Sequence, residues 1–191
     1  MRGSRMKRRA TVRAVAALFA IGGVSVSAYE AMYARTPVGT VEIKRIPAAT
    51  ALETRGLRPY AEISGESFRT LFRYIQANNV KMTVPVEAEM DPGAMRFFAG
   101  TNDAARGLAA DGKVVVAPRP ERTVVSAGLR GRYTRARFDE GFDRLRQWLA
   151  SHPEWVPAGE PYAVYWNSPF VLPFLRHSEV HLPVAPTDGP R

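Results

Sequence analysis

Hydrophobic spacing in the stretch 67–86 predicts a helix that leads directly into a strand. Four apolar residues recur at the spacing of one helix face: Phe68, Leu71, Phe72 and Ile75. Asn78 and Asn79 then end the helix, because asparagine tolerates the left-handed conformation at a helix C-terminus. Beyond them, apolar residues alternate at the period of a strand: Val80, Met82, Val84 and Val86. Pro85 cannot donate to a sheet, so we expect an edge or a bulge there.

A second helix is predicted over 137–151. Its apolar face consists of Phe138, Phe142, Leu145, Trp148 and Leu149. Three of these positions match the first helix after a shift of 70 residues, which carries Phe68, Phe72 and Ile75 onto Phe138, Phe142 and Leu145. Each helix follows a predicted strand pair and precedes a strand that contains proline. We therefore predict an internal duplication with pseudo-twofold symmetry.

The other strands are short segments of alternating or β-branched residues, at 41–46, 48–57, 95–99, 113–117, 123–131, 162–166 and 178–184. We expect the first two to pair with each other. The stretch 59–65 is predicted to be irregular, and the polar, glycine-rich stretch 101–112 a mobile surface loop. Together the elements predict an α+β fold, in which a distorted antiparallel β-barrel or curved sheet carries both helices.

The N-terminal residues predict export from the cytoplasm. Residues 1–13 hold six basic side chains, and an apolar run from 14 to 28 follows with a small-residue end. This is the pattern of a secretory signal peptide over 1–28, with an uncleaved membrane anchor as the alternative. We expect a linker over 29–39, one domain over 40–184 and a tail over 185–191. The domain would then lie in a bacterial periplasm, either free or anchored to the inner membrane.

Charge and composition exclude several classes of protein. The formal net charge is +9, but the six basic residues of the N-terminus account for most of it, and the rest has 21 basic against 18 acidic residues. Such a weakly basic body is not expected to bind nucleic acid. The chain has no cysteine, which excludes disulfides, thiolate metal sites and cysteine nucleophiles.

The titratable residues show no catalytic or metal-binding motif. The histidines are His152, His177 and His181. His177 and His181 flank the last strand on one face, and we expect Glu179 on the opposite face. Solvated polar residues are a better interpretation of this pair than a metal site, so we expect no metal. Because the sequence shows no activated nucleophile or acid/base pair, we expect no enzyme.

Two apolar features exceed what a core requires. One is the Phe68/Phe72 stripe, with Arg69 and Arg73 beside it. The other is the loop 168–175, which contains Phe170 and Phe174. Under one interpretation the stripe is core, the arginines are solvated and the loop aromatics plug the barrel end.

The alternative interpretation is a groove for a flat apolar ligand with acidic groups. The aromatic side chains and Met82 would supply contact area. Arginines on the rim would bind carboxylates in bidentate fashion.

Two motifs resemble the SOUL haem-binding protein family. FRYIQANNVKMTVPV (72–86) is similar to the family's helix that ends in an FRYI segment and leads into a KMTxPV strand. YWNSPFVLPFLRHSEVHL (165–182) is similar to its closing segment, with a Pro-Phe loop, an arginine and a Glu-Val strand. The resemblance covers about residues 40–184. It implies a distorted β-barrel with two helices and an internal duplication.

The resemblance also implies a surface that binds haem or a related porphyrin, made by the first helix and the Pro-Phe loop. The residues carried over to that surface are Phe68, Arg69, Phe72, Arg73, Met82, Phe170, Phe174 and Arg176. Some family members use a histidine axial ligand in the N-terminal half, but this chain has no histidine before His152. Binding would therefore rest on apolar and ionic contacts. The alternatives are a module for other amphipathic small molecules, an enzyme acting on a tetrapyrrole, and an interaction protein that has lost its site.

Overall fold

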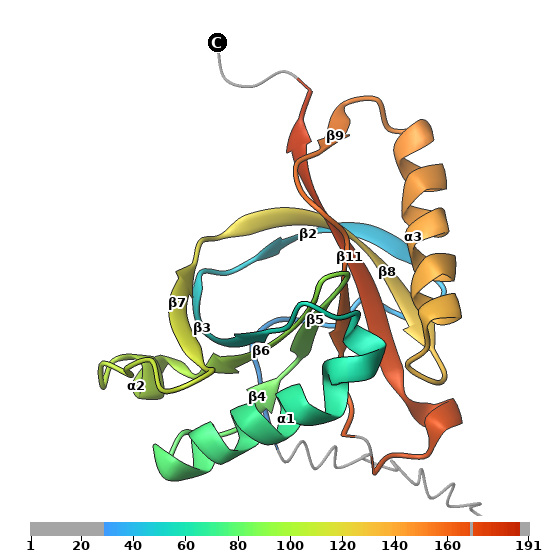
Figure 1. Ribbon diagram of the computed structural model, residues 1–191. Coiled ribbons are helices and arrows are strands. Elements are labelled where there is room, and N and C mark those ends of the chain that lie inside the picture. The colour runs from blue at the N-terminus through green and yellow to red at the C-terminus, as the bar shows by residue number, and fades with distance from the viewer. Residues whose placement is uncertain (1–28, 169, 188–191) are drawn as a thin grey trace, which may run out of the picture.

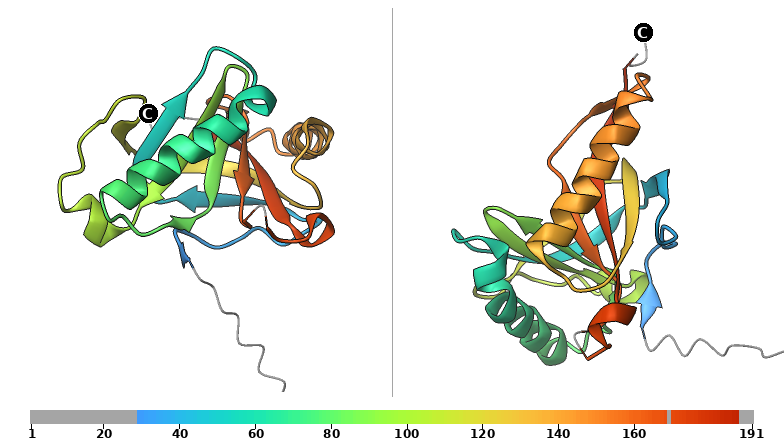
Figure 2. Two further views of the ribbon diagram at one scale, coloured as in Figure 1. Left: turned by 60° about the horizontal axis from the view of Figure 1, so that its bottom comes forward. Right: turned by 90° about the vertical axis from the view of Figure 1, so that its right-hand side faces the viewer.

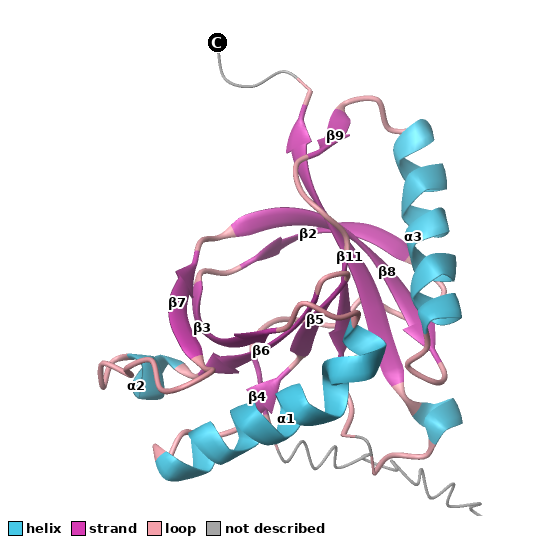
Figure 3. Ribbon diagram, in the orientation of Figure 1, coloured by secondary structure: helices cyan, strands magenta, loops and turns pink. Residues whose placement is uncertain are grey.

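A nine-stranded antiparallel sheet curls into a half-barrel and carries both long helices on its outer face (Figures 1 and 3). The computed structural model describes residues 29–168 and 170–187, so the predicted signal peptide or anchor lies outside the described residues. The strands of the sheet are β2 (Val41–Ile46), β3 (Ala49–Arg55), β5 (Val86–Met90), β6 (Gly93–Ala99), β7 (Val115–Arg119), β8 (Arg122–Arg130), β9 (Trp155–Pro157), β10 (Tyr162–Tyr165) and β11 (His177–Pro186). The expected α+β class, a curved antiparallel sheet with two helices, is confirmed.

Three helices and a short 3₁₀ turn accompany the sheet: α1 (Tyr60–Ala77), α2 (Thr101–Ala104), α3 (Arg135–Ala150) and η1 (Pro173–Leu175). Two further strands of two residues each, β1 (Glu30–Ala31) and β4 (Thr83–Val84), pair in parallel. None of the described helices is long and apolar enough to cross a membrane.

The expected pairing of the first two strands is wrong. The strand order is β2-β8-β11-β10-β5-β6-β3-β7, so β2 and β3 lie at nearly opposite ends of the sheet. Ile46 lies opposite Arg122 and Ala49 opposite Arg119, which is the register of one continuous ladder. The strands β2 and β3 are therefore one bent ribbon that pairs with a second bent ribbon, β7 and β8. The prolines at both bends cannot extend the ladder, and the bends curl the sheet.

The sheet topology has the symmetry that a duplication would produce. The first half contributes β2, β3, β5 and β6, and the second half contributes β7, β8, β10 and β11. Exchanging each strand of the first half with its counterpart in the second half gives the same strand order read from the other end. In chain order, α1 lies between β3 and β5, and α3 lies between their counterparts β8 and β10. The duplication itself, which concerns the origin of the two halves, stays a prediction.

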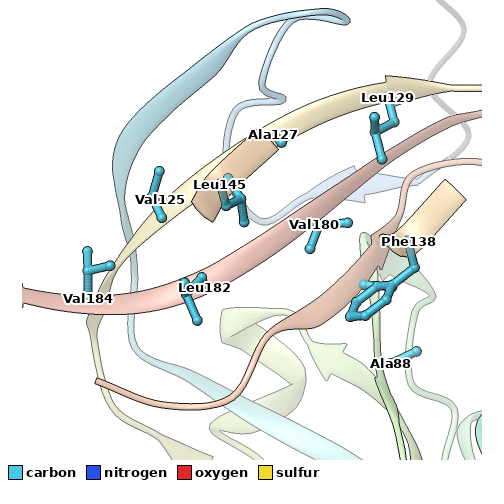
Figure 4. Packing of buried hydrophobic residues seen from close by; sticks show 10 residues of the cluster. Ala88, Val125, Ala127, Leu129, Phe138, Leu145, Val180, Leu182 and Val184 are labelled. Carbon is cyan, nitrogen blue, oxygen red and sulfur yellow. The ribbon is translucent and has the colours of Figure 1, made fainter. Parts of the chain in front are cut away.

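Each long helix closes its own hydrophobic cluster against the outer face. On α1, Leu71, Tyr74 and Ile75 pack with Leu52 and Phe97 of the sheet. On α3, the buried apolar side chains are those of Phe138 and Leu145, and Figure 4 shows them among the apolar side chains of β8 and β11. Both predicted helical stripes are thus core at these positions, because burying one apolar face is what holds an amphipathic helix on a sheet.

Three local expectations differ from the structure. The stretch 59–65 is not irregular, because α1 begins at Tyr60, and Gly65 lies inside the helix. The strand expected over 80–86 is divided at Pro85 into β4 and β5. The predicted loop 101–112 begins with the short helix α2.

The segment 29–39, which we expected to be a linker, lies against the sheet. Its strand β1 pairs with β4, and the Met32 amide donates to the Val84 carbonyl at 2.8 Å. Thr36 is completely buried. Gly128 of β8 is the glycine that permits this approach, because a Cβ there would collide with the carbonyl oxygens of Thr36 and Pro37.

Candidate ligand-binding site

A groove of about 320 Å³ opens between α1 and the end of β10. Its lining consists of Tyr60, Ser64, Gly65, Phe68, Val86, Met95, Tyr133, Tyr165 and Asn167. A smaller adjoining hollow of about 60 Å³ shares four of these residues and adds Tyr29, Phe72, Met82, Val84, Trp166 and Ser168. None of these lining residues carries a charge, and most present an aromatic or aliphatic side chain.

Three tyrosines from separate elements meet in the groove. The rings of Tyr133 and Tyr165 stack at 4.2 Å between centroids, and Tyr60 lies 6.0 Å from Tyr165. Burial raises the pKa of Tyr133 to about 12 and also raises the pKa values of Tyr60 and Tyr165. All three are therefore neutral phenols at neutral pH. Tyr133 is fixed in place, since its hydroxyl accepts from the Asn167 amide at 3.1 Å.

The helix α1 forms one wall of the groove because two aromatic side chains lie one turn apart. Phe68 and Phe72 stack at 5.8 Å, and Phe68 also meets Phe97 edge-on at 5.5 Å. Gly65 leaves this wall open, since a Cβ at that position would find no atom within 4 Å. The helix therefore leaves open space in the groove at this position.

The structure brings three of the predicted site residues together: Phe68 lines both the groove and the adjoining hollow, and Phe72 and Met82 line the hollow. Arg69 and Arg73 are exposed on α1. Arg69 lies one turn after Gly65 and therefore beside the groove. Arg176 stands over the Tyr133 ring, with its guanidinium carbon 5.4 Å from the ring centroid.

Phe170 and Phe174 lie outside the groove lining. Their side chains are 96% and 64% exposed. They do not plug the barrel end, so that interpretation of the loop 168–175 is wrong. Their contact with a ligand stays a prediction.

The three histidines are engaged elsewhere. His152 stacks on Trp148 at 3.6 Å. The Nε2 atom of His177 lies 2.9 Å from the Thr36 carbonyl oxygen, and His181 is buried in the barrel interior. Among the described residues, no group of three or more histidine and acidic side chains is placed to hold a metal ion.

Inside the half-barrel, Glu179 is the centre of a buried polar network. We expected this residue on the opposite face from the two histidines, which was wrong, because residues two apart on a strand share a face. Six groups from five residues lie within hydrogen-bonding distance of its carboxylate: Thr36 N, Thr36 Oγ1, Lys44 Nζ, Ser126 Oγ, Trp166 Nε1 and His181 Nε2. Burial alone would raise the pKa of Glu179, but His181 and Lys44 outweigh it and lower the pKa to about 2.

The partners of His181 define its tautomer. Arg122 Nε donates to the Tyr162 hydroxyl at 3.1 Å, so the hydroxyl proton is available for His181 Nδ1 at 3.2 Å. Burial lowers the pKa of His181, which is the largest influence on it, although Glu179 opposes the shift. The imidazole is therefore neutral, accepts at Nδ1 and donates from Nε2 to Glu179. This network joins the N-terminal segment to the sheet, and neither Glu179 nor His181 is among the residues that line the groove.

Sequence reasoning missed the tyrosines of the groove. Tyr60 fell in the stretch expected to be irregular, Tyr133 in a connection, and Tyr165 in a predicted strand. No spacing links them, because each comes from a different element. Two signals along the chain pointed to this wall: the Phe68/Phe72 spacing and the family motif that begins at Phe72.

The chain belongs to the SOUL family: the sequence profile of the SOUL heme-binding protein matches residues 27–183. Membership implies binding of haem or another small molecule. A comparison with curated proteins finds no match.

Solved structures with the same fold include the C-terminal domain of EcmrR. It matches with a TM-score of 0.62 and 15% identity, over 78% of this chain and 98% of that domain. EcmrR in its complex with DNA matches with a TM-score of 0.63 and 14% identity over 78% of this chain, which spans 58% of the EcmrR chain. A conserved protein from Listeria innocua matches with a TM-score of 0.57 and 12% identity, over 78% of this chain and 94% of that one. At these identities the likeness shows the fold alone.

Proposed function

We propose that the groove beside α1 binds haem or a related tetrapyrrole without a histidine axial ligand. The observation that carries the proposal is the uncharged aromatic groove in a chain of the SOUL family. A porphyrin is flat and apolar over most of its area, which suits the faces of Phe68, Tyr133 and Tyr165. Its propionates would meet Arg69 and Arg73, the exposed cations of the α1 wall.

The residues present fit such a ligand at two points. Gly65 leaves room for the edge of a ring to approach the α1 backbone. Arg176, above Tyr133, supplies a third cation next to the groove. The lining residues include no carboxylate, imidazole or amine that could act as an acid or base. We therefore propose a binding module and not an enzyme.

Titration with haemin and with iron-free protoporphyrin IX tests this proposal. Because area and charge hold the ligand, both compounds should bind with dissociation constants within a few fold of each other. Gly65→Trp should abolish binding of both by filling the groove, whereas Gly65→Ala should leave binding intact. Arg69→Glu should weaken binding about fivefold, or roughly 1 kcal/mol. Absorbance and fluorescence quenching report the binding.

The control for charge is Arg45→Glu, which reverses a cation on β2 that is 74% exposed and paired with Glu121. It should not change the dissociation constant. If haemin bound a hundredfold more tightly than protoporphyrin, a protein side chain would have to coordinate the iron. That result would contradict the proposal. Unchanged binding by a folded Gly65→Trp variant would place the ligand elsewhere.

A second candidate ligand is an amphipathic aromatic cation. The three tyrosine rings favour it, since aromatic faces attract cations. A lipophilic dye such as rhodamine 6G, titrated against the same variants, separates the candidates. Tighter binding of the dye, improved by Arg69→Glu, would favour the cation over the porphyrin.

A further inference from the structure

The loop after β10 holds an apolar cluster in solvent. The side chains of Phe170, Leu172, Phe174 and Leu175 are 96%, 56%, 64% and 49% exposed. Hydrogen bonds nevertheless hold the backbone of this loop. Leu175 N donates to the Leu172 carbonyl and Arg176 Nε donates to the Val171 carbonyl, both at 2.9 Å. A backbone held in this way presents its apolar side chains outward. Exposed apolar clusters of this kind mark interaction sites on soluble domains.

Basic side chains border this loop. Arg130 lies opposite His177 in the β8–β11 ladder, and Arg132 follows two residues later. Both are exposed, and neither makes an ion pair with any described residue. Arg35 joins them, with its guanidinium carbon 5.0 Å from the Trp166 ring centroid. An apolar tip with unpaired cations beside it complements a surface that is anionic outside and apolar within.

The described chain also begins at this end of the molecule. Tyr29 and Ser168 line the same hollow, and the right view of Figure 2 shows β1 and η1 both at the lower end of the molecule. The sequence before Tyr29 is basic over 1–13 and apolar over 14–28. If that segment enters a bilayer, the loop faces the same bilayer.

We propose that Phe170, Leu172, Phe174 and Leu175 form a docking surface for an anionic lipid bilayer, with Arg35, Arg130 and Arg132 on lipid phosphates. The apolar side chains enter the acyl region, and the arginines fix the loop at the headgroup level. This surface would hold the groove close to the membrane, where apolar tetrapyrroles partition.

Because the chain has no cysteine, a single one can report on the loop in the full-length protein. Phe170→Cys carries the environment-sensitive fluorophore NBD. The control is Leu57→Cys, since Leu57 is 99% exposed in the β3–α1 connection, and the left view of Figure 2 shows that connection at the opposite edge from η1. Each protein is added to vesicles of phosphatidylcholine, with or without phosphatidylglycerol.

We expect NBD emission at position 170 to rise severalfold with phosphatidylglycerol vesicles and to be quenched by nitroxide-labelled acyl chains, with no change at position 57. Adding Arg130→Glu and Arg132→Glu should reverse most of the rise.

A label at 170 that stays in water, or that responds no more than the label at 57, would overturn the proposal. An undiminished rise in the arginine variant would overturn the role of the cations. A rise that depends on protein concentration without vesicles would assign the surface to a second copy of the chain.

Discussion

Glu179 shows how much of the interior depends on one carboxylate. It accepts a hydrogen bond from the Thr36 amide at 2.8 Å and one from Trp166 Nε1 at 2.7 Å, so it joins the N-terminal segment, the end of β10 and β11. A buried charge with this many donors is strongly coupled to them, and loss of a single partner leaves an uncompensated charge. The network should therefore control the stability of the fold in acid.

Acid should destabilise the protein in two steps. Burial lowers the pKa of His181, so below its unfolded value of 6.5 the unfolded chain binds the extra proton and stability falls. Glu179 stabilises the fold above its unfolded pKa of 4.5, and this contribution is lost as pH falls toward about 2. We expect each step to change the free energy of unfolding by up to about 1.4 kcal/mol per pH unit, measured by urea unfolding.

His181→Gln tests the first step, because an amide can donate to Glu179 but does not titrate in this range. The slope between pH 7 and 5 should become shallower, with a remainder from His177, whose pKa burial also lowers. The step below pH 4.5 should persist, because it belongs to Glu179. An unchanged slope above pH 5 would remove His181 from the explanation.

The two long helices differ in how closely they approach the sheet. A Cβ on Gly141 of α3 would lie 2.5 Å from a Val180 methyl carbon and 2.8 Å from one of Leu129. A Cβ on Gly65 of α1 would meet nothing within 4 Å. One glycine thus permits contact between a helix and the sheet, while the other leaves an open wall beside the groove.

Alanine at these two glycines should therefore act in opposite directions. Gly65→Ala should raise the free energy of unfolding by about 0.5–1 kcal/mol, since alanine is the better helix former and nothing resists it. Gly141→Ala gains the same propensity but overpacks the α3 contact, so we expect a net loss of about 1 kcal/mol or more. Chemical denaturation of both variants measures this. Stabilisation by both would show that α3 can move away from the sheet at little cost.

At the scale of the whole molecule, the N-terminal segment completes the fold. The bent ribbons curl the sheet, and residues 30–37 lie against its polar inner face through β1, Tyr33 and Thr36. Tyr33 meets Trp166 edge-on at 5.4 Å between centroids. The half-barrel and this segment should consequently behave as one cooperative unit.

Gly128→Ala should detach that segment. The new Cβ would collide with backbone carbonyl oxygens of Thr36 and Pro37, which cannot rotate away as side chains do. We expect faster hydrogen–deuterium exchange at the amides of Met32, Thr36 and Gly39, and a loss of about 1–3 kcal/mol in global stability. Gly65→Ala serves as the matched control with normal protection. Unchanged exchange in the Gly128→Ala variant would mean that the sheet yields instead of the segment.

The sequence by itself determined the class of fold, both long helices, most strands and the family. The fold class, helices and strands rest on local periodicity, which is set by backbone geometry and by the need to bury one face. The family rests on the resemblance of two motifs, at 72–86 and 165–182. The stripe of Phe68 and Phe72 also pointed to one wall of the groove.

Only the tertiary structure decided how these elements combine. At the bend at Pro47, β3 could either turn back to pair with β2 or continue it. The pairing of β2 with β8 and of β3 with β7 decides that it continues. The tyrosines of the groove and the donors to Glu179 come from separate segments, so no spacing along the chain relates them. Periodicity reports which face of an element is buried, whereas a binding site depends on which buried faces meet.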